Sequence, residues 1–141
     1  MSARAVTLLM LVAALGLAAP SPAPAQDHDG HAAVLTLDPA GARWATDAPL
    51  RQGMEAMRAA AVGAPASELA DVVDAQVAYI IENCSLPPEA DANLHLVIEH
   101  LIEAAEALRL DDGARGRTEV IAALNAYGAH FNHPGWRALT S

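Results

Sequence analysis

The sequence predicts an all-α fold, an up-down-up-down four-helix bundle preceded by a signal peptide and a flexible tail. Four stretches of the chain repeat apolar residues at spacings of three and four, which is the period of an amphipathic helix. Connections containing Pro or Gly separate these stretches. No stretch alternates apolar and polar residues for long enough to indicate a strand. Four amphipathic helices joined by short connections pack as a bundle of this kind.

The N-terminal residues 1–25 have the features of an export signal. Arg4 carries their single charge, Ala5–Ala19 is an uncharged apolar run, and Ser21–Ala25 has the small-x-small pattern that signal peptidase cleaves. We therefore expect cleavage after Ala25 and a periplasmic protein.

Residues 26–43 are expected to form a flexible tail. This stretch contains His28 and His31 and is rich in Asp, Gly, Ala and Pro. It buries too little apolar surface to offset the entropy lost on ordering. The bundle itself is expected over residues 44–141, a length suited to one domain.

The first two helices are predicted on either side of a Gly-Ala-Pro break at residues 63–65. Thr46 or Asp47 can cap the first helix through a side-chain oxygen, and Pro49 is tolerated in its first turn. Ser67 is expected to cap the second helix. The two apolar stripes are Leu50, Met54, Met57 and Ala61, and then Leu69, Val73, Gln76 or Val77, Ile80 and Cys84.

The third helix is predicted to start at Pro88, and the fourth to run from about Thr118 to Asn132. Gly113 and Gly116 are assigned to the connection between them. The stripe of the third helix is Asp91, Leu94, Ile98, Leu101, Ala105 and Leu108, and that of the fourth is Val120, Ile121, Leu124, Tyr127, Gly128 and Phe131. After the fourth helix, Trp136 and Leu139 are expected to fold back as a hydrophobic lid.

Charge and composition exclude several classes of function. The formal net charge is −9, and the chain has no Lys. An excess of carboxylates repels nucleic acid, and Schiff-base chemistry and a phosphate-binding Walker lysine both require Lys. After the leader, no apolar run reaches the ~20 residues that cross a bilayer. No nucleophile, base and orienting group can be assembled, so we expect no enzyme.

Chain reversals place the thiol, thioether and imidazole side chains of the predicted bundle at one end. The first helix starts at this end, the second returns to it, the third leaves from it and the fourth comes back. The side chains concerned are Met54, Met57, Cys84, His95, His130 and His133. The tail with His28 and His31 joins the bundle at the same end, and only His100 lies away from it.

Sulfur and imidazole ligands together favour copper, with zinc next. We therefore predict a non-enzymatic protein that binds a transition metal at this end. Cys84 and His95 are the expected central ligands, completed by Met54, His130 or His133. The spacing matches no named metal motif.

Each of these residues also has an ordinary structural interpretation. Met54 lies on a core stripe, and Met fills irregular core gaps well. His95 can cap a helix or pair with a carboxylate, and His130 in a last helical turn is favoured by the helix dipole. Cys84 can be an inert buried thiol. A structural or interaction module without a cofactor therefore stays open, with a second copy of the chain or another periplasmic protein as partner.

Two stretches resemble the periplasmic four-helix cytochromes, cytochrome c-prime and its b-type relatives. Leu50–Arg58 looks like their first helix, and Leu124–Phe131 is similar to the last helix of the b-type family. The resemblance implies an electron carrier with non-covalent haem b, held by Met54 and His130. The motif for covalent haem attachment is missing. Gly128 stands where that family has its axial His, and it leaves space for a planar cofactor or for a closely packed neighbour.

Two further parts of the chain are similar to small exported proteins of proteobacteria to which no activity is assigned. They are Asn83–Asp91 with His95, and His130–Trp136. This resemblance agrees with export but implies no chemistry.

Overall fold

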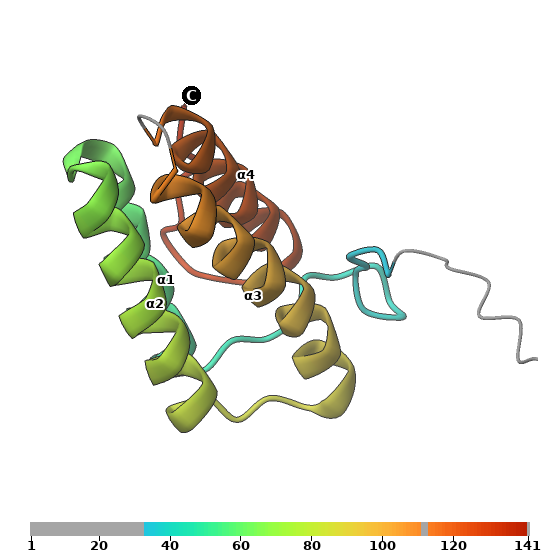
Figure 1. Cartoon of the computed structure of the whole chain (residues 1–141). Coiled ribbons are helices and arrows are strands. Elements are labelled where there is room, and N and C mark those ends of the chain that lie inside the picture. The colour runs from blue at the N-terminus through green and yellow to red at the C-terminus, as the bar shows by residue number, and fades with distance from the viewer. Residues whose placement is uncertain (1–32, 111–112, 141) are drawn as a thin grey trace, which may run out of the picture. The chain divides into compact units, whose positions relative to one another are not determined.

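The computed structural model describes residues 33–110 and 113–140, and it confirms the all-α bundle of four helices. The predicted signal peptide and residues 26–32 of the tail lie outside the described residues. The helices are α1 (Ala48–Gly63), α2 (Ala66–Asn83), α3 (Pro88–Leu108) and α4 (Ala114–His130). Each packs against the next along the chain, so that neighbouring helices run in opposite directions (Figure 1). Among the described residues, no helix has the length and apolar character needed to cross a membrane.

The start of α1 agrees with the sequence prediction. Asp47 is the N-cap, and its Oδ1 accepts a hydrogen bond from the backbone N–H of Leu50 at 2.9 Å. A proline occupies the first turn, where a missing N–H costs nothing. The predicted stripe Leu50, Met54, Met57 and Ala61 is buried in the core.

The start of α2 corrects one prediction. Ser67 does not cap this helix, because the helix already begins at Ala66 with Pro65 in the N-cap position and no side-chain cap. The residue before a proline is held extended, so the helix can start directly after Pro65. Ser67 therefore lies within the first turn.

The bounds of α4 differ from the prediction at both ends. The helix begins at Ala114 rather than near Thr118, and Gly116 lies inside it. It ends at His130 because the next residue, Phe131, becomes extended and pairs with Trp44. The N–H of Trp44 donates to the carbonyl of His130 at 2.8 Å, and the N–H of Asn132 donates to the carbonyl of Trp44 at 2.7 Å.

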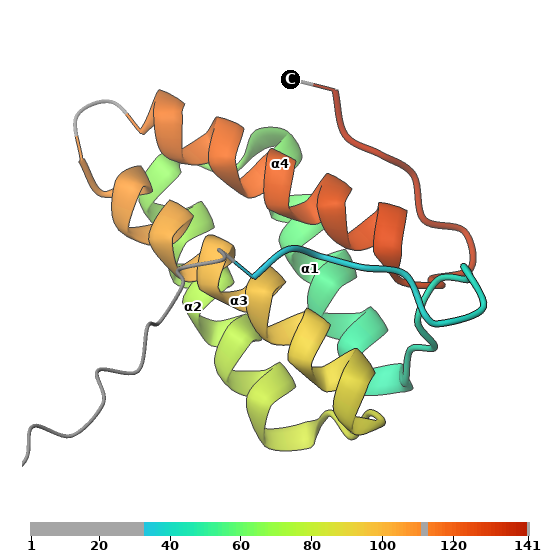
Figure 2. The ribbon, with the colours of Figure 1, turned by 90° about the vertical axis from the view of Figure 1, so that its right-hand side faces the viewer.

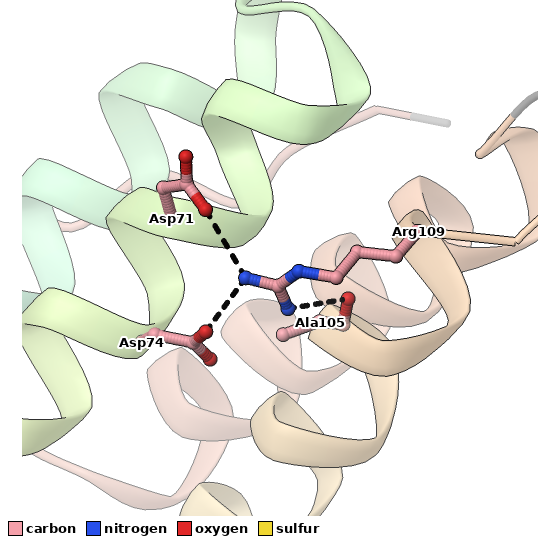
Figure 3. A network of polar contacts seen from close by, with 4 residues as sticks. All are labelled: Asp71, Asp74, Ala105 and Arg109. Atoms are coloured by element: carbon pink, nitrogen blue, oxygen red, sulfur yellow. Dashed lines mark hydrogen bonds and ion pairs between the residues drawn. The ribbon is translucent and has the colours of Figure 1, made fainter.

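Two arginines connect helices outside the core. Arg117 on α4 donates to the carbonyl oxygens of Ala61 and Ala64 at the end of α1. Arg109, which follows α3, reaches across to Asp71 at 3.1 Å and Asp74 at 2.7 Å on α2 (Figure 3). The Arg109 network is exposed, so its contribution to stability is small.

The C-terminal segment forms the predicted lid. It turns back after α4 and runs alongside that helix (Figure 2). The Asn125 side chain accepts from the N–H of Leu139 and donates to its carbonyl, at 2.8 and 2.9 Å. The indole of Trp136 packs edge-on against Tyr127, with 5.0 Å between ring centroids, and over the guanidinium of Arg58. Arg58 also donates to the carbonyl of Arg137 at 2.8 Å, which ties the lid to α1.

Residues 33–43, the described part of the predicted tail, lie against the bundle. The backbone N–H of Thr36 donates to Asn93 Oδ1 on α3 at 2.8 Å, and the carbonyl of Thr36 accepts from the indole of Trp44 at 2.7 Å. Leu35 packs on the hydrophobic core. These contacts hold residues 35 and 36 against α3 and the core.

Candidate metal site

The end of the bundle that the sequence predicts as a metal site is organised around Asp47. Its Oδ1 caps α1, while its Oδ2 accepts from the backbone N–H of Ser85, just after α2, at 2.7 Å. The thiol of Cys84 also hydrogen-bonds to this carboxylate. Partial burial alone would raise the pKa of Asp47, but the hydrogen bonds from Ser85, Leu50 and Cys84 hold it below its usual value. Asp47 is therefore a charged acceptor that joins the start of α1 to the end of α2.

Cys84 is half-buried immediately after α2. Burial, followed by the charge of Asp47, its hydrogen bond and the charge of Asp91, raises the pKa of the thiol to about 12. The group is protonated at neutral pH because a thiolate here would be partly removed from water and would also face two carboxylates.

His95 lies on α3, one turn after Asp91. Its Nδ1 is 2.9 Å from the backbone carbonyl of Asp91 and 3.5 Å from that residue's Oδ2. The side chain is 61% exposed, so the ring can turn without disturbing the core. Donation from Nδ1 to the carbonyl leaves Nε2 with the lone pair, which is the arrangement found in histidines that bind metals.

The two C-terminal histidines lie at the end of α4 and just beyond it. His130 Nδ1 is 2.8 Å from the carbonyl of Ala126. His133 Nδ1 is 3.0 Å from the hydroxyl of Tyr127, and its ring lies 5.0 Å from that of Trp136. Burial, together with Arg51 and Arg58, holds the pKa of His133 below its usual value, against the effect of Glu55. His133 is therefore neutral at pH 7, and it belongs to the aromatic cluster under the lid.

Met54 is separated from solvent. The structure places it on α1 with none of its surface exposed, among the core side chains. Its sulfur could ligate a metal at this end only if the core opened.

The space beside Gly128 is filled by the lid. A β-carbon at this position would lie 2.1 Å from Nε1 of Trp136 and 2.2 Å from its Cδ1. The indole therefore occupies the place that the sequence left open for either a planar cofactor or a packed neighbour. With Met54 also enclosed, the residues present do not fit a haem as they are packed.

The structure brings together some of the predicted ligands and adds two carboxylates. Cys84 lies beside Asp47 and within the field of Asp91, and Asp91 pairs with His95. Within residues 33–110 and 113–140, no three His, Cys, Asp or Glu side chains stand close enough together to hold a metal ion. Sequence reasoning passed over Asp47 and Asp91 as ligands, although a helix N-cap and an acid four residues before a histidine were visible signals.

The high pKa of Cys84 predicts an unreactive thiol. We expect native protein at pH 8 to react with iodoacetamide roughly 50-fold more slowly than urea-unfolded protein, because the loss of thiolate outweighs the greater nucleophilicity of a high-pKa sulfur. Mass spectrometry at timed intervals measures the rate. Asp47→Asn should accelerate the native reaction, since it removes one of the two charges that disfavour the thiolate. Equal rates in folded and unfolded protein contradict this account.

The fold and this end of the molecule define a class, an all-α four-helix bundle with a thiol–carboxylate pair where α1 begins and α2 ends. Comparison of the chain with protein-family models, with curated proteins and with solved structures finds no match.

Proposed function

We propose that this protein is an exported, non-enzymatic bundle that binds a transition-metal ion where α1 begins, α2 ends and α3 begins. One observation carries the proposal. The Cys84 thiol lies against the carboxylate of Asp47 and in the field of Asp91, and the Asp91 carboxylate contacts His95. Cys84 and His95 are the proposed central ligands.

The electrostatics of this corner favour a cation. Burial is the largest cause of the raised pKa of Cys84, and the carboxylates of Asp47 and Asp91 add to it by creating a negative potential. A metal ion that displaces the proton experiences the same potential. Affinity should therefore rise with pH. Thiolate, imidazole and carboxylate are the usual ligands of zinc, and the thiolate also suits copper. Because Met54 is enclosed in the core, the preference for copper now depends on Cys84 alone.

Binding at this corner requires a local change in side-chain position. As the side chains stand, the described residues hold no group of three ligands. His95 must turn from the Asp91 carbonyl toward Cys84, and its exposure makes this rotation inexpensive. His130, His133 or solvent would complete the coordination.

Titration of reduced, metal-free protein with Cu(I) and with Zn²⁺ tests the proposal. Wild type should bind one equivalent, with proton release. Cys84→Ser and His95→Ala should each weaken binding by at least about tenfold, the equivalent of roughly 1.4 kcal/mol. His100→Ala is the matched control, because this histidine also lies exposed on α3 but outside the site.

Two outcomes overturn the proposal. One is that wild type binds neither metal more tightly than micromolar. The other is that His100→Ala, the control, weakens binding as much as His95→Ala does. Either result favours a structural or interaction module without a cofactor. A reddish preparation with a Soret band after addition of haemin would instead support the haem b carrier with Met54 and His130.

A further inference from the structure

A hollow between α3 and α4 lies outside the proposed metal site. Its volume is about 360 Å³, and it is open on one side. It is lined by His100 and Glu103 from α3 and by Glu119, Ala122, Ala123 and Ala126 from α4. On α4 the lining extends from Glu119 to Ala126, which is ~10 Å along the helix axis. The hollow therefore has the length of one small ligand rather than of a docked helix.

The floor and the rim of this hollow differ in chemistry. The three alanines form an apolar floor on α4, and their small side chains leave the space unfilled. Glu103 and Glu119 stand on the two opposite helices that form its walls. Glu119 pairs with Arg115 at 3.3 Å, but the Arg115 side chain is 70% exposed and that of Glu119 is 40% exposed, so this pair competes weakly with a ligand. The hollow thus combines apolar surface with two carboxylates from different helices.

This combination selects a class of ligand. Sites for small molecules are hollows of ≈ 300–1,000 Å³ that are mostly apolar and contain a few polar groups that set orientation. An anion would be repelled by both glutamates and by the acidic chain as a whole. A bare metal ion would leave the apolar alanine floor unused.

We propose that the hollow binds a small organic cation of the alkylammonium type. The ammonium group lies between Glu103 and Glu119, and the alkyl chain covers Ala122, Ala123 and Ala126. Both carboxylates contribute charge, while contact with the floor makes affinity depend on chain length. This site is independent of the metal site, from which it differs in every residue.

Titration of the full mature chain by two-dimensional NMR tests this proposal. The probes are n-butylammonium and n-hexylammonium, compared with n-hexanol and n-hexanoate at equal ionic strength. We expect shifts at His100 and at the floor alanines, and about two- to fourfold tighter binding for each added methylene until the floor is covered. Hexanol should bind more weakly than hexylammonium, and hexanoate should not bind.

Variants separate the roles of the rim and the floor. Glu103→Gln and Glu119→Gln should each weaken hexylammonium binding by about threefold or more, whereas Glu82→Gln, an exposed acid on α2, should leave it unchanged. Ala122→Leu fills the hollow from an exposed position and should abolish binding with the spectrum of the fold retained. Ala75→Leu, on the exposed side of α2, is its control.

Three results overturn the proposal. Binding of hexanoate as tight as that of hexylammonium shows that charge plays no part. If Glu82→Gln weakens hexylammonium binding as much as Glu103→Gln and Glu119→Gln do, the cation responds only to the overall negative charge of the protein. We expect a sub-millimolar to millimolar dissociation constant for hexylammonium, so 10 mM of this ligand should occupy the hollow. If the folded protein shows no shifts at the hollow up to this concentration, the site does not exist.

Discussion

Gly116→Ala is expected to destabilise the bundle by about 2 kcal/mol or more. A β-carbon at this position would lie 2.3 Å from the backbone nitrogen of Leu108 and 2.7 Å from the carbonyl carbon of Ala107. These are backbone atoms of α3, so a side-chain rotation cannot relieve the overlap and the two helices must separate. Overpacking typically costs 1–3 kcal/mol and occasionally more, and overlap with backbone atoms places this substitution at the upper end. About 2 kcal/mol of that cost is left after the gain of ~1 kcal/mol from the higher helix propensity of Ala.

Urea denaturation followed by circular dichroism measures this loss, with Gly63→Ala as control. Gly63 is the last residue of α1, and a β-carbon there would meet nothing within 4 Å. The control should therefore be neutral or should gain up to about 1 kcal/mol, since it lowers the entropy of the unfolded chain. If both variants have the same midpoint, α3 and α4 do not approach each other as closely as the structure indicates.

The same glycine shows where sequence reasoning succeeds and where it fails. The apolar period predicts four helices because each must bury one stripe, and this requirement can be read from the chain alone. Whether a glycine breaks a helix or lies within one is set by the neighbouring helix. Gly116 was assigned to a connection, yet it lies inside α4 because the backbone of α3 passes too close for any side chain.

Gly128 and Trp136 show the same dependence on the fold. The sequence indicates both space at Gly128 and an aromatic residue that folds back, but the two features are eight residues apart and belong to different segments. The chain turns back after α4 (Figure 2), and this path brings the indole into the space beside Gly128. The alternative of a planar cofactor at Gly128 could not be decided from residue types.

The position of Cys84 in the bundle was predictable from the sequence, but its neighbours were not. Topology places Cys84 at the end where α1 begins, and the structure agrees. The depth of Met54 in the core and the partnership of Cys84 with Asp47 depend on helix rotation and side-chain direction. A periodic pattern shows which residues of a helix lie on its apolar face, but it does not fix the helix rotation or the direction of side chains at the edge of that face. The sequence therefore does not identify the carboxylates of Asp47 and Asp91 as neighbours of the thiol.

Asp47→Ala is expected to destabilise the protein by about 2 kcal/mol at neutral pH. Loss of an N-cap costs ~1 kcal/mol, and leaving the Ser85 N–H without its acceptor costs about 1 kcal/mol more. The 2.9 Å bond from Leu50 is local to the start of α1, whereas the 2.7 Å bond from Ser85 joins that start to the end of α2. Thermal denaturation should show a lower midpoint by roughly 8–16 °C for a domain of this size.

Asp47→Asn separates the charge from the shape of this side chain. An Asn at the cap still accepts from Leu50, but its amide cannot accept from both N–H groups, so we expect an intermediate loss of stability. The pKa of Asp47 in the folded protein lies below its usual 3.8. The stability that its charge supplies is therefore complete above the pKa of the unfolded chain and is lost as pH falls through the lower pKa of the folded state.

The difference in unfolding free energy between wild type and Asp47→Asn should consequently be constant from pH 5 to pH 7 and shrink below about pH 3.8. Subtracting the two curves removes the other carboxylates, which titrate equally in both proteins. A difference that stays constant down to pH 2 shows that Asp47 acts through shape alone. In that case its charge neither ties α1 to α2 nor holds the proton on Cys84, and the negative potential proposed to attract a metal ion loses its main source.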